Sequence, residues 1–123
     1  ATDAPLLPHQ LKRVARRASL GVARTGGTAS NGSGDIFIAF STGNPDTAGS
    51  RPVSALKMLN NSNLSVIFQA TVEATEEAII NAMIAAETME GRDGNRSEAI
   101  PHRELQQILD SYSRLKQTTK DRK

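Results

Sequence analysis

Ser33 and Asp35 are the residues whose types and spacing are best suited to chemistry. They lie in the segment TGGTASNGSGDIFIAF (residues 25–40), with Gly32 and Gly34 on either side of the serine. Glycines there would let backbone N–H groups point toward a ligand, as an oxyanion site requires, and the hydroxyl and carboxylate could both flank a reacting centre. The alternative is a plain loop in which Asp35 accepts a hydrogen bond from a nearby backbone N–H. The spacing alone favours the plain loop.

The same glycines do not fit a phosphate-binding loop. A Walker loop needs Lys directly after its last glycine and a helix beyond it, whereas Gly32 is followed by Ser33 and then by an apolar, strand-like run. A dinucleotide-binding fingerprint also needs a helix N-terminus after its glycines. Both kinds of site are therefore excluded.

The two histidines, His9 and His102, each follow a proline at an expected helix start. A helix-end role suits both better than the role of base in a Ser-His-Asp triad. Neither belongs to a cluster of ligands, and the chain contains no Cys, so no metal site, disulfide or Cys nucleophile is expected. The other group able to accept a proton at neutral pH is a terminal α-amino group.

Residues 5–24 are predicted to form the helix that precedes the loop, with Pro5 and Pro8 at its beginning. Apolar residues recur in it at spacings of three and four: Leu7, Leu11, Val14, Ala15, Ala18 and Val22. The opposite face carries Lys12, Arg13, Arg16 and Arg17. This face is either solvated or a patch for nucleic acid or another anion. Because no aromatic residues accompany it for base stacking, solvation is favoured.

The loop leads into residues 36–40, five apolar residues in a row that predict a strand covered on both faces. Residues 51–59 are a candidate second strand, although Lys57 and Met58 blur the alternation. A strand buried on both faces needs pairing neighbours, and this chain offers too few. We therefore expect the missing strands to lie outside it.

A long helix is predicted from Ser62 or Asn63 to about Met89, with Gly91 just past its end. Residues 91–94 are a predicted turn. A last helix follows the Ile100-Pro101 pair and carries Leu105, Ile108, Leu109, Tyr112 and Leu115. Residues 116–123 are a polar tail.

The length of 123 residues suits one domain or a piece of a larger one. A net charge of +2 is too small to indicate nucleic acid, and no apolar run approaches the ~20 residues that span a bilayer. The first residues, ATDAPLLPHQ, lack the features of a signal peptide. We expect a soluble protein, cytoplasmic or periplasmic, with neither nucleic acid nor a membrane as partner. The start at Ala1 without Met indicates a processed product or a fragment.

Three blocks of the sequence resemble the small β subunit of the L-aminopeptidase D-amidase/esterase family, which includes the β-peptidyl aminopeptidases. They are ATDAPLLPHQLKRVARRASLGVARTGGTASNGSGDIFIAFSTGN, FQATVEATEEAIINAMIAAETMEGRDG and AIPH. The resemblance extends to about Tyr112. It implies a precursor that cleaves itself into α and β chains and a Ser nucleophile at the new β N-terminus. Such an enzyme releases N-terminal residues from short peptides, amides or esters through an acyl-enzyme, and no cofactor is expected.

For the fold, the resemblance implies an α+β chain that is part of an αββα four-layer sandwich. The α subunit from the same precursor would complete this sandwich, which is similar to that of N-terminal-nucleophile hydrolases but differs in chain connection. Residues 1–115 would be the β-subunit portion of a single hydrolase domain. The αβ units would assemble into a homo-oligomer.

The resemblance assigns Ser33 to the family's second serine, which hydrogen-bonds around the amine and hydroxyl of the nucleophile. Asp35 matches the acidic residue that orients this amine, and Gly32 and Gly34 would allow tight backbone approach. In the family, the strand headed by the nucleophile immediately precedes the block that begins here at Ala1, so the nucleophile is expected just upstream. The remaining oxyanion and substrate-binding groups come from the α chain, so substrate chirality and the choice between α- and β-amino acids do not follow from this sequence.

Two alternatives stay open at the level of the sequence. One is a non-catalytic interaction module whose basic first helix binds an anionic partner. The other is a relative of the self-cleaving acetyltransferases of arginine biosynthesis. These share a similar overall build but use a Thr nucleophile and a different loop sequence, which makes them the weaker comparison.

Overall fold

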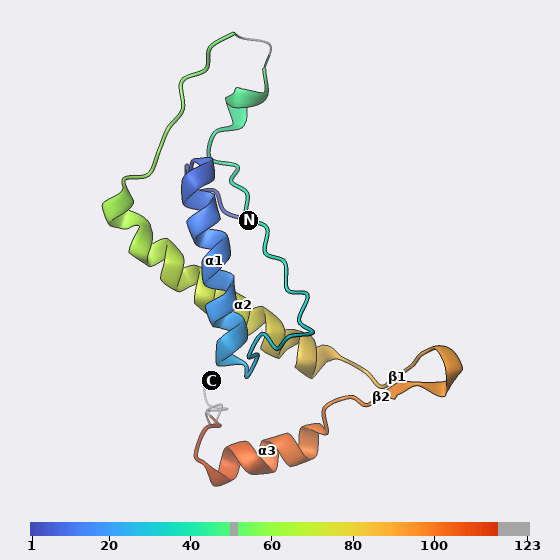
Figure 1. Cartoon of the computed structure of the whole chain (residues 1–123). Helices are drawn as coiled ribbons and strands as arrows, with labels where there is room; N and C mark the ends of the chain where they lie inside the picture. Colours follow the sequence, from blue (N-terminus) through green and yellow to red (C-terminus); the bar gives the residue numbers. More distant parts are fainter. Residues whose placement is uncertain (50–51, 116–123) are drawn as a thin grey trace, which may run out of the picture. The chain divides into compact units, whose positions relative to one another are not determined.

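The structure is a computed structural model that describes residues 1–49 and 52–115. The chain is of the α+β class and divides into two compact units, Ala1–Ile79 and the described residues from Ile80 onward. Figure 1 shows the elements in chain order: α1 (Pro8–Arg24), a 3₁₀ turn (Pro45–Ala48), a second 3₁₀ turn (Asn61–Asn63), α2 (Leu64–Ala85), β1 (Met89–Glu90), a third 3₁₀ turn (Arg92–Gly94), β2 (Arg96–Ser97) and α3 (His102–Ser111).

Helix α1 confirms the first predicted helix but begins at Pro8 rather than at residue 5. Pro8 stands at the first helical position, where its missing N–H costs least. The N–H of Leu7 donates to Oε1 of Gln10 at 3.1 Å, which satisfies a donor at the helix start. Pro5 lies before the helix, where its carbonyl accepts from the N–H of Leu59 at 2.8 Å.

The core of the first unit is built around three buried side chains, Leu6, Val14 and Leu64, with half-buried apolar neighbours packed against them. The buried side of α1 consists of Gln10, Val14 and Gly21. Of the predicted apolar stripe, only Val14 is fully buried. The periodicity identified the helix, but two of its three most buried positions are not apolar side chains.

Helix α2 begins at Leu64, directly after the predicted start at Ser62 or Asn63. It follows a 3₁₀ turn in which the Ser62 N–H donates to the Asn60 side chain. The helix ends at Ala85, earlier than predicted, because Met89 and Glu90 pair with Ser97 and Arg96 in a short antiparallel hairpin. Gly91 therefore does not cap the helix, which corrects that prediction.

The hairpin turn itself confirms the predicted turn at residues 91–94. The N–H of Gly91 donates to the carbonyl of Asn95 at 2.7 Å, which closes the turn between the two strands. The last helix, α3, runs from His102 to Ser111 and confirms the final predicted helix. Tyr112 and Leu115 lie beyond its end.

The predicted strand at residues 36–40 is wrong for the part of the chain that the structure describes. The segment has no strand neighbour there and makes a single parallel bridge nearby, Thr2 with Ser41. Ile36 and Ile38 are 84% and 85% exposed, so this segment is not covered on both faces. A strand is defined by its ladder, and one short N-terminal segment cannot supply one.

The second candidate strand, residues 51–59, is not formed either over the described residues 52–59, while residue 51 lies outside them. The side chain of Asn44 replaces a strand neighbour: its Oδ1 accepts from the N–H of Lys57 at 2.8 Å, and its Nδ2 donates to the Lys57 carbonyl at 3.0 Å. The predicted tail at residues 116–123 lies outside the described residues. No helix in the described ranges is long and apolar enough to cross a membrane.

Candidate functional site

The glycine-rich loop is anchored to the C-terminus of α1 by a Schellman motif. Gly26 has a left-handed φ of 93°, and its N–H donates to the carbonyl of Ala23. The N–H groups of Thr25 and Gly27 both donate to the carbonyl of Val22, at 3.1 and 3.0 Å. This is the pattern that satisfies the free carbonyls at a helix end. It reverses the chain so that the loop folds back beside the helix.

A turn inside the loop then presents the candidate catalytic residues. The N–H of Ser33 donates to the carbonyl of Ser30 at 2.8 Å. Shortly before it, Ala29 has a φ of 46°, which is uncommon for a residue with a Cβ. The loop is thus held in a defined shape.

Ser33 and Asp35 are in direct contact, because the Ser33 hydroxyl donates to Oδ2 of Asp35 at 2.5 Å. Both residues are exposed. The contact orients the hydroxyl hydrogen toward the carboxylate and leaves the lone pairs of Oγ free to accept from an amine or another hydroxyl. In the plain-loop alternative Asp35 would accept from a backbone N–H, whereas its partner here is a side chain two residues away.

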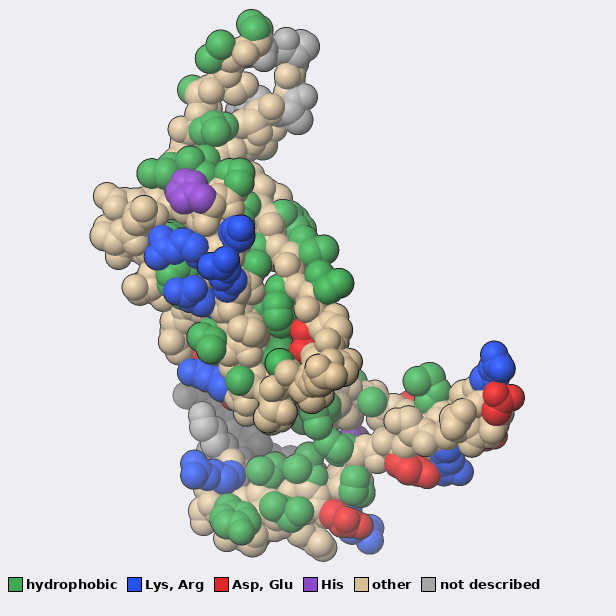
Figure 2. All heavy atoms as spheres, in the orientation of Figure 1, with side chains coloured by type: hydrophobic (Ala, Val, Ile, Leu, Met, Phe, Trp, Pro, Cys, Tyr) green, Lys and Arg blue, Asp and Glu red, His purple; other side chains and the backbone are tan. Residues whose placement is uncertain are grey.

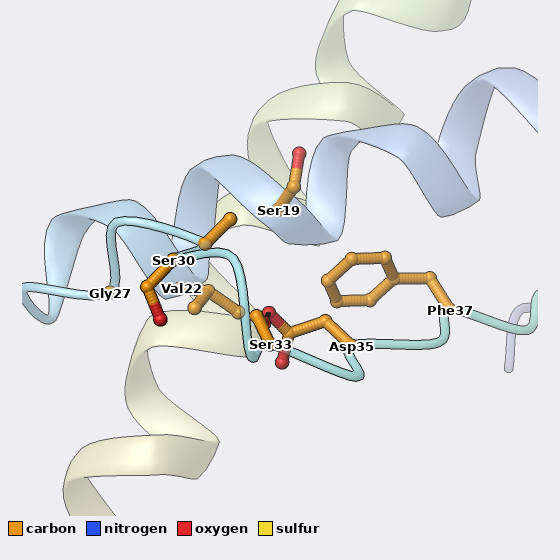
Figure 3. A pocket seen from close by; sticks show the side chains of 8 residues that line it. Ser19, Val22, Gly27, Ser30, Ser33, Asp35 and Phe37 are labelled. Atoms are coloured by element: carbon orange, nitrogen blue, oxygen red, sulfur yellow. Dashed lines mark hydrogen bonds between the residues drawn. The ribbon is translucent and has the colours of Figure 1, made fainter.

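The pair lines a hollow of about 270 Å³ between the loop and α1 (Figure 3). Its full lining is Ser19, Val22, Gly27, Ala29, Ser30, Ser33, Asp35 and Phe37. Figure 3 shows the ring of Phe37 directed toward α1. Val22 belongs to the apolar stripe of the first predicted helix and Phe37 to the predicted strand at residues 36–40, and no pattern in the sequence marks either as a site residue.

The structure leaves the two flanking glycines, Gly32 and Gly34, in open space. Among the described residues, no atom outside the immediate chain neighbours lies within 4 Å of the place where a Cβ would stand at either position. Neither φ is left-handed. Tight backbone approach at these glycines therefore remains a prediction from the resemblance.

The histidines are found at helix starts, as predicted. His9 lies in the first turn of α1, and His102 is the first residue of α3, with Nε2 at 2.9 Å from the Ile84 carbonyl. Neither lines the hollow. The described residues contain no group of His, Cys, Asp or Glu side chains that could hold a metal ion.

The basic face of α1 is partly occupied by an aromatic ring from α2, which the sequence did not indicate. The guanidinium carbons of Arg13 and Arg17 lie 5.1 and 4.2 Å from the ring centroid of Phe68, within the range of a cation–π interaction. Figure 2 shows Lys and Arg side chains gathered on this face. Two of the four cations thus pack against a half-buried ring of the same chain, which accounts for part of the basic face without an anionic partner.

Comparison with known proteins gives the family. The sequence matches Peptidase family S58 over residues 1–97. It is 50% identical over 117 residues to the beta-peptidyl aminopeptidase BapA of Sphingosinicella microcystinivorans, covering 94% of this chain and 29% of that protein.

Two solved structures are similar over nearly the whole chain. The PH0078 protein from Pyrococcus horikoshii OT3 is 52% identical with a TM-score of 0.86, covering 92% of this chain and 32% of that one. The L-aminopeptidase D-Ala-esterase/amidase from Ochrobactrum anthropi is 48% identical with a TM-score of 0.84, covering 93% and 32%. The latter is described as a prototype for the serine aminopeptidases and a new variant among the Ntn hydrolase fold.

The chain spans less than a third of the length of each of these relatives. The match to the family nevertheless covers most of the chain, and the predicted resemblance is confirmed. This chain belongs to peptidase family S58.

Proposed function

We propose that this chain is the small-subunit part of a self-processed serine aminopeptidase that releases N-terminal residues from short peptides, amides or esters. The observation that carries the proposal is the contact between Ser33 and Asp35 at the edge of a hollow. This contact occurs in a chain whose family relatives include named aminopeptidases. The rest of the enzyme, including its oxyanion and substrate-binding groups, would come from the larger part of the precursor.

The nucleophile in this proposal is a serine at a chain N-terminus just upstream of Ala1. Its α-amino group takes the proton from its own hydroxyl as the oxygen attacks the substrate carbonyl. The proton then passes to the leaving amine or alcohol, and water hydrolyses the acyl-enzyme. Both steps need the α-amino lone pair to face the hydroxyl, and hydrogen bonds to the amine set that direction.

Ser33 and Asp35 have the chemistry to orient such an amine. The carboxylate of Asp35 holds the hydrogen of the Ser33 hydroxyl, so Oγ presents lone pairs to the hydrogens of a neighbouring amine. The second carboxylate oxygen can accept a further hydrogen bond and stabilise the ammonium form after proton transfer. In this proposal both residues support the base, and neither is the nucleophile.

The extended segment at residues 36–40 suggests how the fold is completed. Ile36 and Ile38 are almost fully exposed, and exposure of large apolar side chains to water is unfavourable in free energy. We propose that strands of the α subunit cover this segment and complete an αββα sandwich, and that the αβ units form a homo-oligomer.

The function is tested by Ser33→Ala and Asp35→Asn in the complete precursor. We expect each change to slow self-cleavage and to lower kcat by on the order of 10²-fold, as loss of an acid–base support does. Self-cleavage is followed by the appearance of two chains on a denaturing gel, and turnover by release of a chromogenic amine from an amino-acid anilide. The matched control is Ser65→Ala, at an exposed serine of α2, which should keep wild-type rates. Wild-type rates in both site variants would sink the proposal.

A further inference from the structure

We infer that Gly27 is a positioning residue: its missing side chain lets the glycine-rich loop lie against Val22 and so sets where Ser33 and Asp35 stand. The inference rests on the proposed function. It concerns a residue that lines the same hollow as Ser33 and Asp35 and fixes the base of the loop that carries them.

Gly26 and Gly27, at the start of the loop, are each required to be glycine for a different physical reason. Gly26 has a left-handed φ of 93° with open space around it, so its requirement is torsional. Gly27 has no left-handed φ, but a Cβ there would lie 2.4 Å from Cγ1 of Val22 and 3.0 Å from the Val22 carbonyl oxygen. Carbon atoms pack no closer than about 3.5 Å. The requirement at Gly27 is therefore one of space.

Val22 connects this contact to the site. Its carbonyl accepts from the N–H groups of Thr25 and Gly27 and from the Thr25 hydroxyl at 2.8 Å, so it anchors the loop. Its side chain also lines the hollow that Ser33 and Asp35 line (Figure 3). The loop thus rests on the same residue that forms one wall of the site.

A shift at Gly27 has a short path to the candidate catalytic pair. Gly27 lies three positions before Ser30, and the Ser30 carbonyl accepts a hydrogen bond from the Ser33 N–H at 2.8 Å. A valine in a helix strongly prefers one χ1 rotamer, and the Val22 carbonyl oxygen at 3.0 Å is backbone, so we expect the contact at 2.4 Å to be relieved in part by a backbone shift at Gly27 of up to about 1 Å. A misplacement of that size is enough to lower a rate by about 10²-fold.

The test is a double-mutant cycle in the complete precursor with Gly27→Ala, Val22→Ala and the double variant. We expect Gly27→Ala to lower kcat by about 10- to 100-fold and to slow self-cleavage, with KM changed much less, because the displaced groups act on the nucleophile. Val22→Ala removes the clashing Cγ1, so the double variant should recover most of the loss and match Val22→Ala. The matched control is Gly91→Ala, where a Cβ would meet only the Asn95 carbonyl oxygen at an ordinary 3.5 Å.

Two results would overturn the inference: wild-type kcat in Gly27→Ala, or a double variant whose loss is the product of the two single losses. If Gly27→Ala alone does not fold, the double variant decides. A folded double variant with the kcat of Val22→Ala supports the steric account, and an unfolded or inactive one overturns it. Ser33→Ala and Asp35→Asn are measured in parallel. If those two retain wild-type rates, the proposed function fails; if they are slow while Gly27→Ala is not, only this inference fails.

Discussion

Gln10 shows how one polar side chain holds two segments of the first unit together. It is fully buried, and its Nε2 donates to the Leu59 carbonyl at 2.8 Å and to Oδ1 of Asn61 at 2.9 Å. Its Oε1 accepts from the N–H of Leu7. The residue therefore caps α1 and at the same time fixes the chain just before α2. Its hydrogen bonds offset the cost of burying an amide.

We expect Gln10→Leu to lower the free energy of unfolding by about 2–4 kcal/mol, because a leucine of similar size leaves the Leu59 carbonyl, Oδ1 of Asn61 and the Leu7 N–H without this partner. Urea unfolding of the complete protein measures the change as a shift of the midpoint at constant slope. Gln106→Leu, at an exposed position of α3, is the control and should shift stability by less than about 0.5 kcal/mol. Equal midpoints for the two variants would contradict the role of Gln10.

At the scale of elements, the crossing of α1 and α2 depends on the absence of a side chain at Gly21 (Figure 1). A Cβ there would lie 2.6 Å from Cβ of Thr75 and 2.8 Å from the Val72 carbonyl oxygen. Because the latter atom is backbone, no side-chain rotation relieves the contact. The ion pair between Arg24 and Glu76, at 3.0 Å, lies farther along the same two helices and is exposed enough to contribute little. The close packing at Gly21 therefore contributes more to holding the two helices together than this ion pair does.

The variant Gly21→Ala tests whether helix propensity or helix packing has the larger effect on stability at this position. Propensity alone would stabilise α1 by up to about 1 kcal/mol, whereas forcing the helices apart costs about 1–3 kcal/mol. We expect packing to win, with a lower thermal midpoint in the complete protein. Leu20→Ala, at a neighbouring exposed residue, controls for general effects on α1. A raised midpoint in Gly21→Ala would show that the helices do not approach as closely as described.

At the scale of the whole molecule, one extended segment of the described chain exposes its large apolar side chains to solvent. Ile36, Ile38 and Phe40 are all more than half exposed along one extended segment. In the part of the chain that the structure describes, none of the amides at 36–40 donates to another backbone carbonyl. Exposed apolar side chains and amides without a backbone acceptor fit the proposal that strands of the α subunit cover this segment.

Hydrogen exchange tests whether the rest of the protein covers this segment. In the complete, processed protein we expect the amides at 36–40 to exchange at least on the order of 10²-fold more slowly than in the isolated chain of residues 1–123, because a strand ladder would then protect them. The amides of 91–95, in the exposed hairpin turn, serve as the internal reference. Fast exchange at 36–40 in the complete protein would contradict the proposed sandwich.

The sequence by itself determined the local features of this protein. Three helices were predicted nearly at their observed positions, because apolar periodicity, prolines and turn residues act over a few neighbours. The turn at 91–94 was predicted for the same reason. Ser33 and Asp35 were singled out as a pair, and they do touch, because they are two residues apart in one loop.

Only the tertiary structure decided which surfaces meet. Gln10 and Gly21 are buried because of what crosses over them, and no pattern of apolar residues marks a glutamine or a glycine as core. Arg17 lies on Phe68 because α1 and α2 are packed together. The segment at 36–40 failed as a predicted strand because a strand is a relation between distant parts of a chain. Its apolar sequence predicts that it is covered, and only the arrangement in space shows that the described residues do not cover it.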